Sequence, residues 1–386
     1  MPSDSYLQIR ASLDSTTEIT GGDSRTGVGA VFINKAIDRM IREVKNVTVD
    51  FSPHVARKTM YQRAYIWNLK TNLNNGTSKT VVYNDGGTGT PRPSQFLQIV
   101  APVISFRSDY EVTNLTLATS ASYFDALDSE ARDALKSHFY TEEQMMILGD
   151  DASTETAGLT LNGLIGVTSS WKGLKQLLSS AVAVSAGTSG GFADASTVYN
   201  HTRSSTVTDR EYALNCQTVC TSATATTPLS VQNIEDMITV SNNQGAKFSR
   251  RLFLVSEFRL NRIGDLIAPQ GRYVVGASSV QLDGGKEVLS WRNIPIIASR
   301  LMTYFGVTST NGSSVTFTDT DRAICLLDMD SISVYNVSGV DARHTPVNGT
   351  DTSQRSDVTG GWFKSYEIFV VEKFNTQVVG WNLSAP

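Results

Sequence analysis

The sequence predicts an α+β protein of several lobes, because three patterns occupy separate parts of its 386 residues. Residues 61–73 alternate apolar and polar side chains with a period of two, which is typical of strands. Residues 123–148 repeat apolar side chains near a period of 3.6, which indicates one long helix. Beyond residue 230, helix and strand patterns alternate, as in an α/β lobe. Because single hydrophobic cores stop growing near about 250 residues, we expect two or three lobes.

The N-terminal region predicts an arm followed by a short helix. Residues 1–28 are polar and show no hydrophobic periodicity, so they cannot pack on themselves. Residues 31–44 (VFINKAIDRMIREV) then place their apolar side chains on one stripe. This spacing predicts a short amphipathic helix.

A long hairpin is predicted next. Its first strand runs from Tyr61 to Leu73, and Asn74-Asn75-Gly76 supplies the positive-φ residues of a tight turn. Residues 79–83 (KTVVY) return as the second strand. The hairpin has too little apolar surface to be stable alone in water, so we expect another surface to cover it. The candidate contact residues on it are Tyr61, Arg63, Tyr65, Trp67, Lys70, Lys79, Tyr83 and Arg92.

The rest of the chain divides into helices, strands and one polar stretch. The long helix is expected to stop at Gly149, where a left-handed C-cap residue belongs. Residues 185–228 are rich in Ser, Thr, Ala and Gly, which predicts a loose insertion. Ser230 caps a further helix. Strands are predicted at residues 96–112, 251–255, 288–291, 294–298, 323–327, 366–371 and 376–381, and a helix at 171–184.

Catalytic, cofactor-binding and metal-ligating patterns are missing from the sequence. The histidines are scattered, and Cys216 and Cys220 have no further ligand close in sequence. Neighbouring acids on a helix point about 100° apart, so Glu142 and Glu143 do not converge on one ion. Asp150 follows the helix end, where carboxylates usually bond to turn amides. The sequence therefore predicts a protein that is not an enzyme and has no cofactor and no metal.

Composition and charge limit the partners. Charged residues make up only 18% of the chain and the formal net charge is −4, which gives no electrostatic reason for a stable complex with nucleic acid. No apolar run reaches the roughly 18–20 residues that span a bilayer, so no membrane is expected. The N-terminus lacks the pattern of a signal peptide, which predicts synthesis in a cytoplasm.

The order of these elements resembles the major capsid proteins of tailed double-stranded DNA phages, the Hong Kong 97-type fold. The segment Ile147-Leu148-Gly149-Asp150, followed by Gly158-Leu159 or by Gly163-Leu164-Ile165-Gly166, is similar to the turn that ends the family's spine helix and the Gly-Leu segment after it. Residues 260–273 look like its Leu-x-x-Leu segment leading to Gly-Arg-Tyr. Residues 291–297 look like its strand with Gly-x-Pro-Val-Val, although Asn293 stands where Gly is usual. The resemblance also takes the last two strands as a closing hairpin.

The resemblance implies a domain plan for the chain. It consists of an N-arm, an extended E-loop hairpin, a P-domain with a long spine helix, and an α/β A-domain. The implied boundaries are 1–28 for the arm, 29–56 for the P-domain start, 57–95 for the E-loop, 96–149 for the P-domain with its spine helix at 123–148, 150–349 for the A-domain with the insertion at 185–228, and 350–386 for the closing P-domain strands.

The resemblance also implies a function. A capsid protein self-assembles as hexamers and pentamers into an icosahedral shell that encloses double-stranded DNA without binding it specifically. Its location would be the virion, after a period in the host cytoplasm. Separate scaffolding, portal and decoration proteins are further partners that the family allows. Some members cross-link a hairpin lysine, for which Lys70 and Lys79 are the candidates, but no partner site is identifiable. The alternatives are a tail or receptor-binding protein and a cargo-holding nanocompartment shell.

Overall fold

The structure is a computed structural model that divides by its internal contacts into two units. Unit 1 contains residues 1–47, 106–139 and 342–364, and unit 2 contains residues 48–105, 140–341 and 365–386. The residues that the structure describes are 49–72, 95–120, 125–149, 171–180, 197–206, 209–219, 228–267, 279–281, 287–305, 323–338, 343–347, 358–381 and 383. The predicted arm, the helix at 31–44, the strand at 79–83 and the Gly158–Gly166 segment lie outside these residues.

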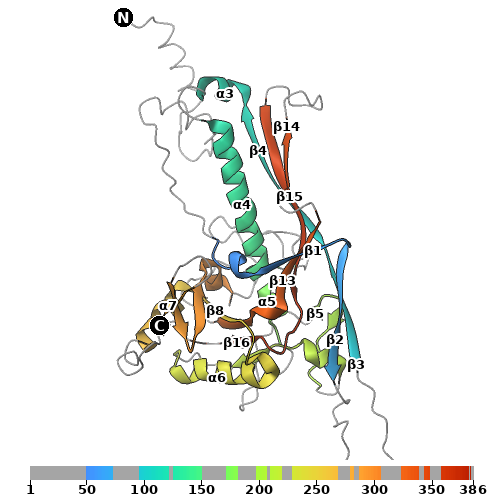
Figure 1. Cartoon of the computed structure of the whole chain (residues 1–386), viewed down its shortest axis with the longest axis vertical. Helices are drawn as coiled ribbons and strands as arrows, with labels where there is room; N and C mark the ends of the chain where they lie inside the picture. Colours follow the sequence, from blue (N-terminus) through green and yellow to red (C-terminus); the bar gives the residue numbers. More distant parts are fainter. Residues whose placement is uncertain are drawn as a thin grey trace, which may run out of the picture. The chain divides into compact units, whose positions relative to one another are not determined.

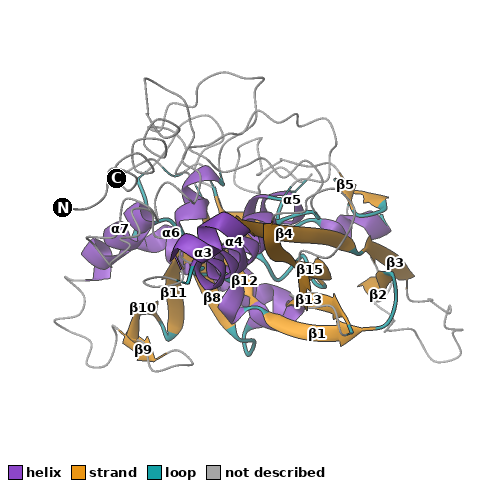
Figure 2. Ribbon diagram, turned by 90° about the horizontal axis from the view of Figure 1, so that it is seen from above, coloured by secondary structure: helices purple, strands orange, loops and turns teal. Residues whose placement is uncertain are grey.

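Unit 2 contains a seven-stranded mixed sheet (Figure 2). Its described strands are all short. The hydrophobic runs RLFLV and ICLL form two central strands, and almost all of their side chains are buried on both faces of the sheet. The strand order is β7 (Gln217–Val219), β16 (Val378–Gly380), β12 (Ile324–Asp328), β8 (Arg251–Val255), β11 (Ile294–Ala298), β10 (Glu287–Trp291) and β9 (Ser279–Gln281). The predicted strands at 251–255, 288–291, 294–298 and 323–327 are thus confirmed to within one residue at each end.

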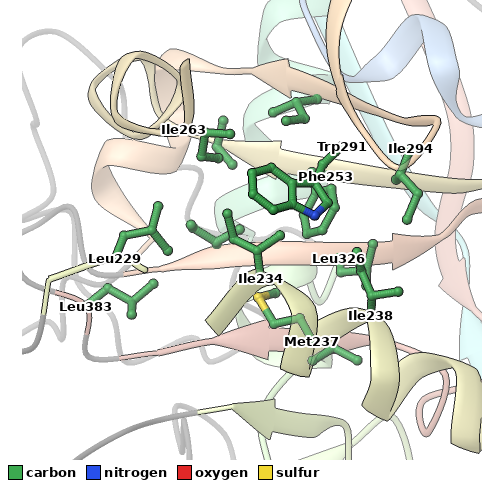
Figure 3. Close-up of a cluster of buried hydrophobic side chains, with 14 residues drawn as sticks. Leu229, Ile234, Met237, Ile238, Phe253, Ile263, Trp291, Ile294, Leu326 and Leu383 are labelled. Carbon is green, nitrogen blue, oxygen red and sulfur yellow. The ribbon is translucent and has the colours of Figure 1, made fainter. Parts of the chain in front are cut away.

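Two helices cover one face of this sheet. Phe253 is the register partner of both Ile296 and Leu326, so these side chains point to the same side. The helices α6 (Val231–Ser241) and α7 (Glu257–Ile267) pack on that side through Ile234 and Ile263 (Figure 3). This cluster is the hydrophobic core of the lobe.

Local capping and turn chemistry in unit 2 follow the sequence. Ser230 begins α6 as predicted: its hydroxyl accepts from the Asn233 amide at 3.3 Å, and the Asn233 side chain accepts from the Ser230 amide at 3.0 Å. Between β10 and β11, Arg292 and Asn293 have φ values of 48° and 64°. A two-residue hairpin turn needs such values, and asparagine tolerates them better than most residues. This explains how Asn293 can stand where glycine was expected.

The second sheet contains one group of strand pairs in unit 2 and another in unit 1. In unit 2, β1 (Ala56–Met60) pairs in parallel with β13 (Ile332–Val337), which pairs with the C-terminal half of β15 (Val358–Val371). In unit 1, the N-terminal half of β15 pairs with β14 (Arg343–Val347). The strand β4 (Ile104–Thr113) also pairs with β15 and leads into α3 (Asn114–Ser120).

The long helix α4 (Ala126–Leu148) confirms the helix predicted at 123–148 (Figure 1). Its N-terminal part lies in unit 1, where the buried His138 stacks on Phe106. It ends at Leu148 as predicted, and the Gly149 carbonyl accepts from the Gly173 amide at 2.9 Å. A Cβ at Gly173 would lie 2.5 Å from the Gly149 nitrogen, so only glycine permits this approach. The helix predicted at 171–184 is short, α5 (Leu174–Leu177).

The prediction that the last two strands form a hairpin with each other is wrong. β15 and β16 belong to different sheets, and the turn between them crosses from one sheet to the other. The 3-10 helix η6 (Met329–Ser331) makes a similar crossing between β12 and β13. Gln377 joins the two crossings, because its side chain accepts from the Asp328 amide at 2.9 Å and donates to the Ser331 hydroxyl at 2.8 Å. These hydrogen bonds join residues that are distant in sequence, so the residue pattern within each strand does not predict them.

Candidate functional site

The predicted hairpin is built from two strands of unit 2. β2 (Ala64–Asn72) pairs antiparallel with β3 (Gln95–Pro102), from Ala64 opposite Pro102 to Asn72 opposite Gln95. The sequence predicted residues 79–83 as the returning strand. In the structure the strand opposite β2 is β3, and residues 79–83 lie outside the described part of the chain. The tight turn predicted at Asn74-Asn75-Gly76 also lies outside the described residues.

The two faces of the hairpin differ in burial. On one face, β2 presents the half-buried Tyr65 and Trp67, and β3 presents Leu97, Ile99 and Ala101, which are at most 5% exposed. The sequence predicted that this apolar face would lack cover within its own chain. For the described part of the hairpin that prediction is wrong, because the chain itself buries Leu97, Ile99 and Ala101 and half-buries Tyr65 and Trp67.

The cover comes from the segment that was predicted to be a loose insertion. Its 3-10 helix η2 (Arg210–Leu214) packs against both β2 and β3. The short strands β5 (Thr197–Val198) and β6 (His201–Thr202) lie beside the hairpin, as Figures 1 and 2 show for β5. The ring of Tyr199 meets that of Trp67 edge to face, with centroids 5.5 Å apart. The described part of residues 185–228 is therefore packed structure, which its polar composition concealed.

A tyrosine pair attaches the hairpin to the second sheet. Tyr65 of β2 stacks on Tyr335 of β13 with ring centroids 3.8 Å apart. Both phenols hydrogen-bond to the Glu372 carboxylate, at 3.0 and 2.7 Å. Burial, together with the hydrogen bond to Glu372, raises the pKa of Tyr335, so this phenol stays protonated and donates. Lys58 lies 3.8 Å from the same carboxylate.

The opposite face of the hairpin is open among the described residues. Ile66 is 48% exposed and Phe96 55%, and Tyr61, which precedes β2, is 86% exposed. Of the residues predicted as contacts, Tyr61, Arg63 and Lys70 are exposed, Tyr65 and Trp67 contact their own subunit, and Lys79, Tyr83 and Arg92 lie outside the described residues. The sequence reasoning missed Ile66 and Phe96. The alternation itself could have found Ile66, because it puts this residue on the side of Asn68 and Lys70.

The strand that leads into the hairpin is held by buried acids of α4 and β15. Arg57 of β1 contacts Glu142 at 2.5 Å and Glu367 at 3.5 Å, and both carboxyl groups are 1% exposed. Glu143 accepts hydrogen bonds from the amides of Phe51 and Ser52, at 3.0 and 3.2 Å. The two neighbouring glutamates thus have separate partners, as their angular separation on the helix predicts. No metal-binding group of acids, histidines or cysteines occurs among the described residues.

Glu143 should make stability depend on pH. Burial raises the pKa of this carboxyl to about 7, although its hydrogen bonds to Ser52, Phe51 and Ser299 act the other way. An acid whose folded pKa is raised favours folding at low pH, and this contribution is lost as pH rises from about 4.5 to 7. Over this pH range, the free energy of unfolding of Glu143→Gln should fall by roughly 2–3 kcal/mol less than that of the parent. The reason is that an uncharged amide can keep the same three hydrogen bonds.

Chemical denaturation of the unassembled subunit between pH 5 and 8 measures this effect. Asp265 of α7 is exposed and supplies a control. The stability of Asp265→Asn should vary with pH in the same way as that of the parent. Equal pH profiles for Glu143→Gln and the parent would contradict the assignment.

The described cysteines and His138 are buried in the protein interior. Cys216 and Cys325 are buried free thiols, and burial raises the pKa of Cys216 to about 12, which makes it a poor nucleophile. Cys220 lies outside the described residues. His138 is fully buried, with Nδ1 3.1 Å from the Ser108 hydroxyl. The described helices include none with the length and apolar character needed to cross a bilayer.

Comparison with solved structures identifies the fold. No family model matches the sequence, and no curated protein matches it. The cyanophage A-1(L) capsid structure matches with a TM-score of 0.54 at 12% identity, covering 90% of this chain and 97% of that chain. The capsid of a native GTA particle matches with a TM-score of 0.54 at 10% identity, covering 95% and 100%. The chain has the fold of phage capsid proteins. A third capsid structure, from cyanophage P-SCSP1u, matches with a TM-score of 0.50 at 10% identity, covering 94% and 96%.

The capsid fold agrees with the mixture of helices and strands that the sequence predicts. Because the match extends over at least nine-tenths of both chains in each case, the capsid fold accounts for the whole molecule rather than one lobe. The resemblance found in the sequence is thus confirmed for the fold.

Proposed function

We propose that this protein is a major capsid protein, which self-assembles as hexamers and pentamers into an icosahedral shell around double-stranded DNA. The observation that carries this proposal is the match to the cyanophage A-1(L) capsid over 90% of the chain. The net charge of −4 fits a wall that encloses DNA without binding it tightly. The proposed location is the virion, with the unassembled subunit in the host cytoplasm.

The proposal extends to the domain plan and to the contact surface. The P-domain, E-loop and A-domain boundaries given above remain predictions. We propose that the open hairpin face contacts a second copy of the chain through Tyr61, Arg63, Lys70, Ile66 and Phe96. Tyr65 and Trp67 would serve assembly by fixing the hairpin to its own subunit. Lys79, Tyr83 and Arg92, which lie outside the described residues, remain predicted contacts.

Negative-stain electron microscopy of the purified protein, before and after nuclease treatment, tests the function. We expect closed hollow shells, and shells that contain nuclease-protected DNA when isolated from virus particles. A solitary subunit under every solution condition, with no shells in virus preparations that contain the protein, would overturn the proposal. Shells filled with protein cargo would favour a nanocompartment, and attachment to tails alone would favour the tail alternative.

The hairpin contact should be sensitive to charge on its open face. Full burial of a large apolar side chain contributes about 1.5–3 kcal/mol. About half of this remains to be gained at Ile66 and Phe96, an aspartate adds the cost of burying a charge, and each contact is repeated throughout a shell. We therefore expect Ile66→Asp and Phe96→Asp to raise the subunit concentration needed for assembly by at least about tenfold, because 1.4 kcal/mol corresponds to a factor of ten. Light scattering during assembly measures this threshold.

Two conservative variants control for folding and for shape. Ile66→Val and Phe96→Leu keep the face apolar and should assemble near the parental concentration. Circular dichroism should show that all four variants remain folded, because these side chains are about half exposed in the subunit. If both aspartate variants assembled at the parental concentration, the proposal that this face is a contact would be overturned. The proposed function would not be affected.

A further inference from the structure

The outer edge of β3 is occupied by side chains instead of a strand. The Gln98 carbonyl accepts a hydrogen bond from Nε2 of His201 at 2.8 Å, and the Val100 amide donates to Oδ1 of Asn200 at 3.2 Å. Because a carbonyl can only accept, His201 must carry its proton on Nε2. An open strand edge is a ready site for pairing with another extended chain. These two side chains use the backbone groups that such a chain would need.

The turn that carries these side chains is strained. Val198 of β5 pairs with His201 of β6, which leaves Tyr199 and Asn200 as a two-residue turn. Tyr199 has a φ of 49°, a left-handed conformation that is unfavourable for a bulky residue by about 1–2 kcal/mol. Glycine would adopt this conformation without strain. The surrounding contacts must therefore hold the tyrosine in place.

Those contacts are made by the hairpin and the second sheet. The Tyr199 ring meets Trp67 of β2 edge to face, and its hydroxyl donates to the Phe369 carbonyl at 3.3 Å. Edge-to-face aromatic pairs contribute about 0.5–1.5 kcal/mol beyond their buried area. The same turn thus touches the buried face of the hairpin and the edge of β3.

A buried arginine anchors the segment to the body of unit 2. Arg203 follows β6, is 6% exposed, and donates to the carbonyls of Gln176, Leu177 and Leu214 at 2.9–3.1 Å. The first two carbonyls are at the end of α5, where a cation is favourable. Arg203 therefore fixes the segment to the body of unit 2 near its middle, while the turn before it and η2 after it both contact the hairpin.

We propose that residues 197–206 and 209–214 form a clasp that fixes the base of the hairpin to its own subunit and blocks the edge of β3 against pairing with another extended chain. The clasp acts before assembly and does not depend on the proposed shell. It orders the base of the hairpin in the free subunit, so that the open face is presented to partners in one direction. It also prevents the hairpins of two free subunits from pairing edge to edge.

Hydrogen exchange of the full-length, unassembled subunit tests the clasp. Asn200→Ala removes the acceptor for the Val100 amide, and we expect this amide to exchange about fivefold faster, which corresponds to a net hydrogen bond of about 1 kcal/mol. Asn200→Asp keeps an acceptor oxygen and should keep the amide protected. Thr202→Ala, an exposed position on β6 with its side chain outside these contacts, is the second control. The Leu254 amide in β8 should exchange equally in all variants.

The double variant Asn200→Ala/His201→Ala tests the blocked edge. We expect analytical ultracentrifugation to find concentration-dependent association of this variant into irregular species under conditions where the parent stays unassembled. Unchanged exchange at Val100 in the double variant would overturn the clasp. Faster exchange without new association would overturn the blocking of the edge. Neither readout requires shells, so failure of the clasp and failure of the proposed function are distinguishable.

Discussion

Gly360→Ala is expected to destabilise unit 1 by about 3 kcal/mol or more, at the upper end of the cost of overpacking. Gly360 is buried in β15, and a Cβ there would lie 2.2 Å from the Tyr110 carbonyl oxygen and 2.9 Å from the Glu111 Cα. Both atoms belong to the backbone of β4, so no flexible side chain can move aside. β4 would have to separate from β15, and the pairing of the two strands would be lost.

Hydrogen exchange that resolves single segments measures this change, because the two units can open separately. We expect amides in β4 and in the N-terminal half of β15 to lose protection, while β8 and β12 in unit 2 keep theirs. Gly264→Ala is the matched control. Gly264 lies inside α7 with nothing within 4 Å of an added Cβ, so the same chemical change should stabilise the protein by about 0.5–1 kcal/mol. Stabilisation by both substitutions would show that β4 does not approach Gly360 as described.

Features set by neighbours in sequence could be predicted. The length of α4 follows from its apolar repeat, the start of α6 from Ser230, and the strand β8 from its run of apolar residues. Each depends on interactions within a few residues, which periodicity and capping rules describe directly. These local elements, in their order, were also what made the resemblance to capsid proteins visible.

Features set by distant contacts could not be predicted. The polar segment around Tyr199 shows little hydrophobic pattern, yet it packs on β2 because Trp67, more than 100 residues away in sequence, offers a ring. β16 leaves β15 because Gln377 bonds to the crossing at Asp328. Alternation gave the two faces of β2 correctly, but it could not show which face its own chain would cover. The candidate contact surface is therefore the open face of the hairpin, which carries Ile66.

Two buried acids, one in α4 and one in β15, should make Arg57→Met strongly destabilising. Removing one partner from a buried ion pair typically costs about 3–5 kcal/mol, and Arg57 contacts two carboxyl groups, Glu142 and Glu367, that are each 1% exposed. Without the cation, folding must either bury these charges or protonate both groups. Protonation is easier in acid, so we expect the destabilisation to be large at pH 8 and smaller at pH 5.

Lys58→Met is the control for this substitution, because Lys58 is the next residue of β1 and its ion pair is exposed. Its side chain is 43% exposed and lies 3.8 Å from Glu372, so its loss should cost less than about 1 kcal/mol. Urea unfolding of unassembled subunits at both pH values measures the difference. Adding Glu142→Gln and Glu367→Gln to Arg57→Met removes the charges that the arginine balances, and should restore stability at pH 8 more than at pH 5. Equal losses at the two pH values, unchanged by the glutamines, would mean that Arg57 stabilises β1 through the packing of its aliphatic stem and not through its charge.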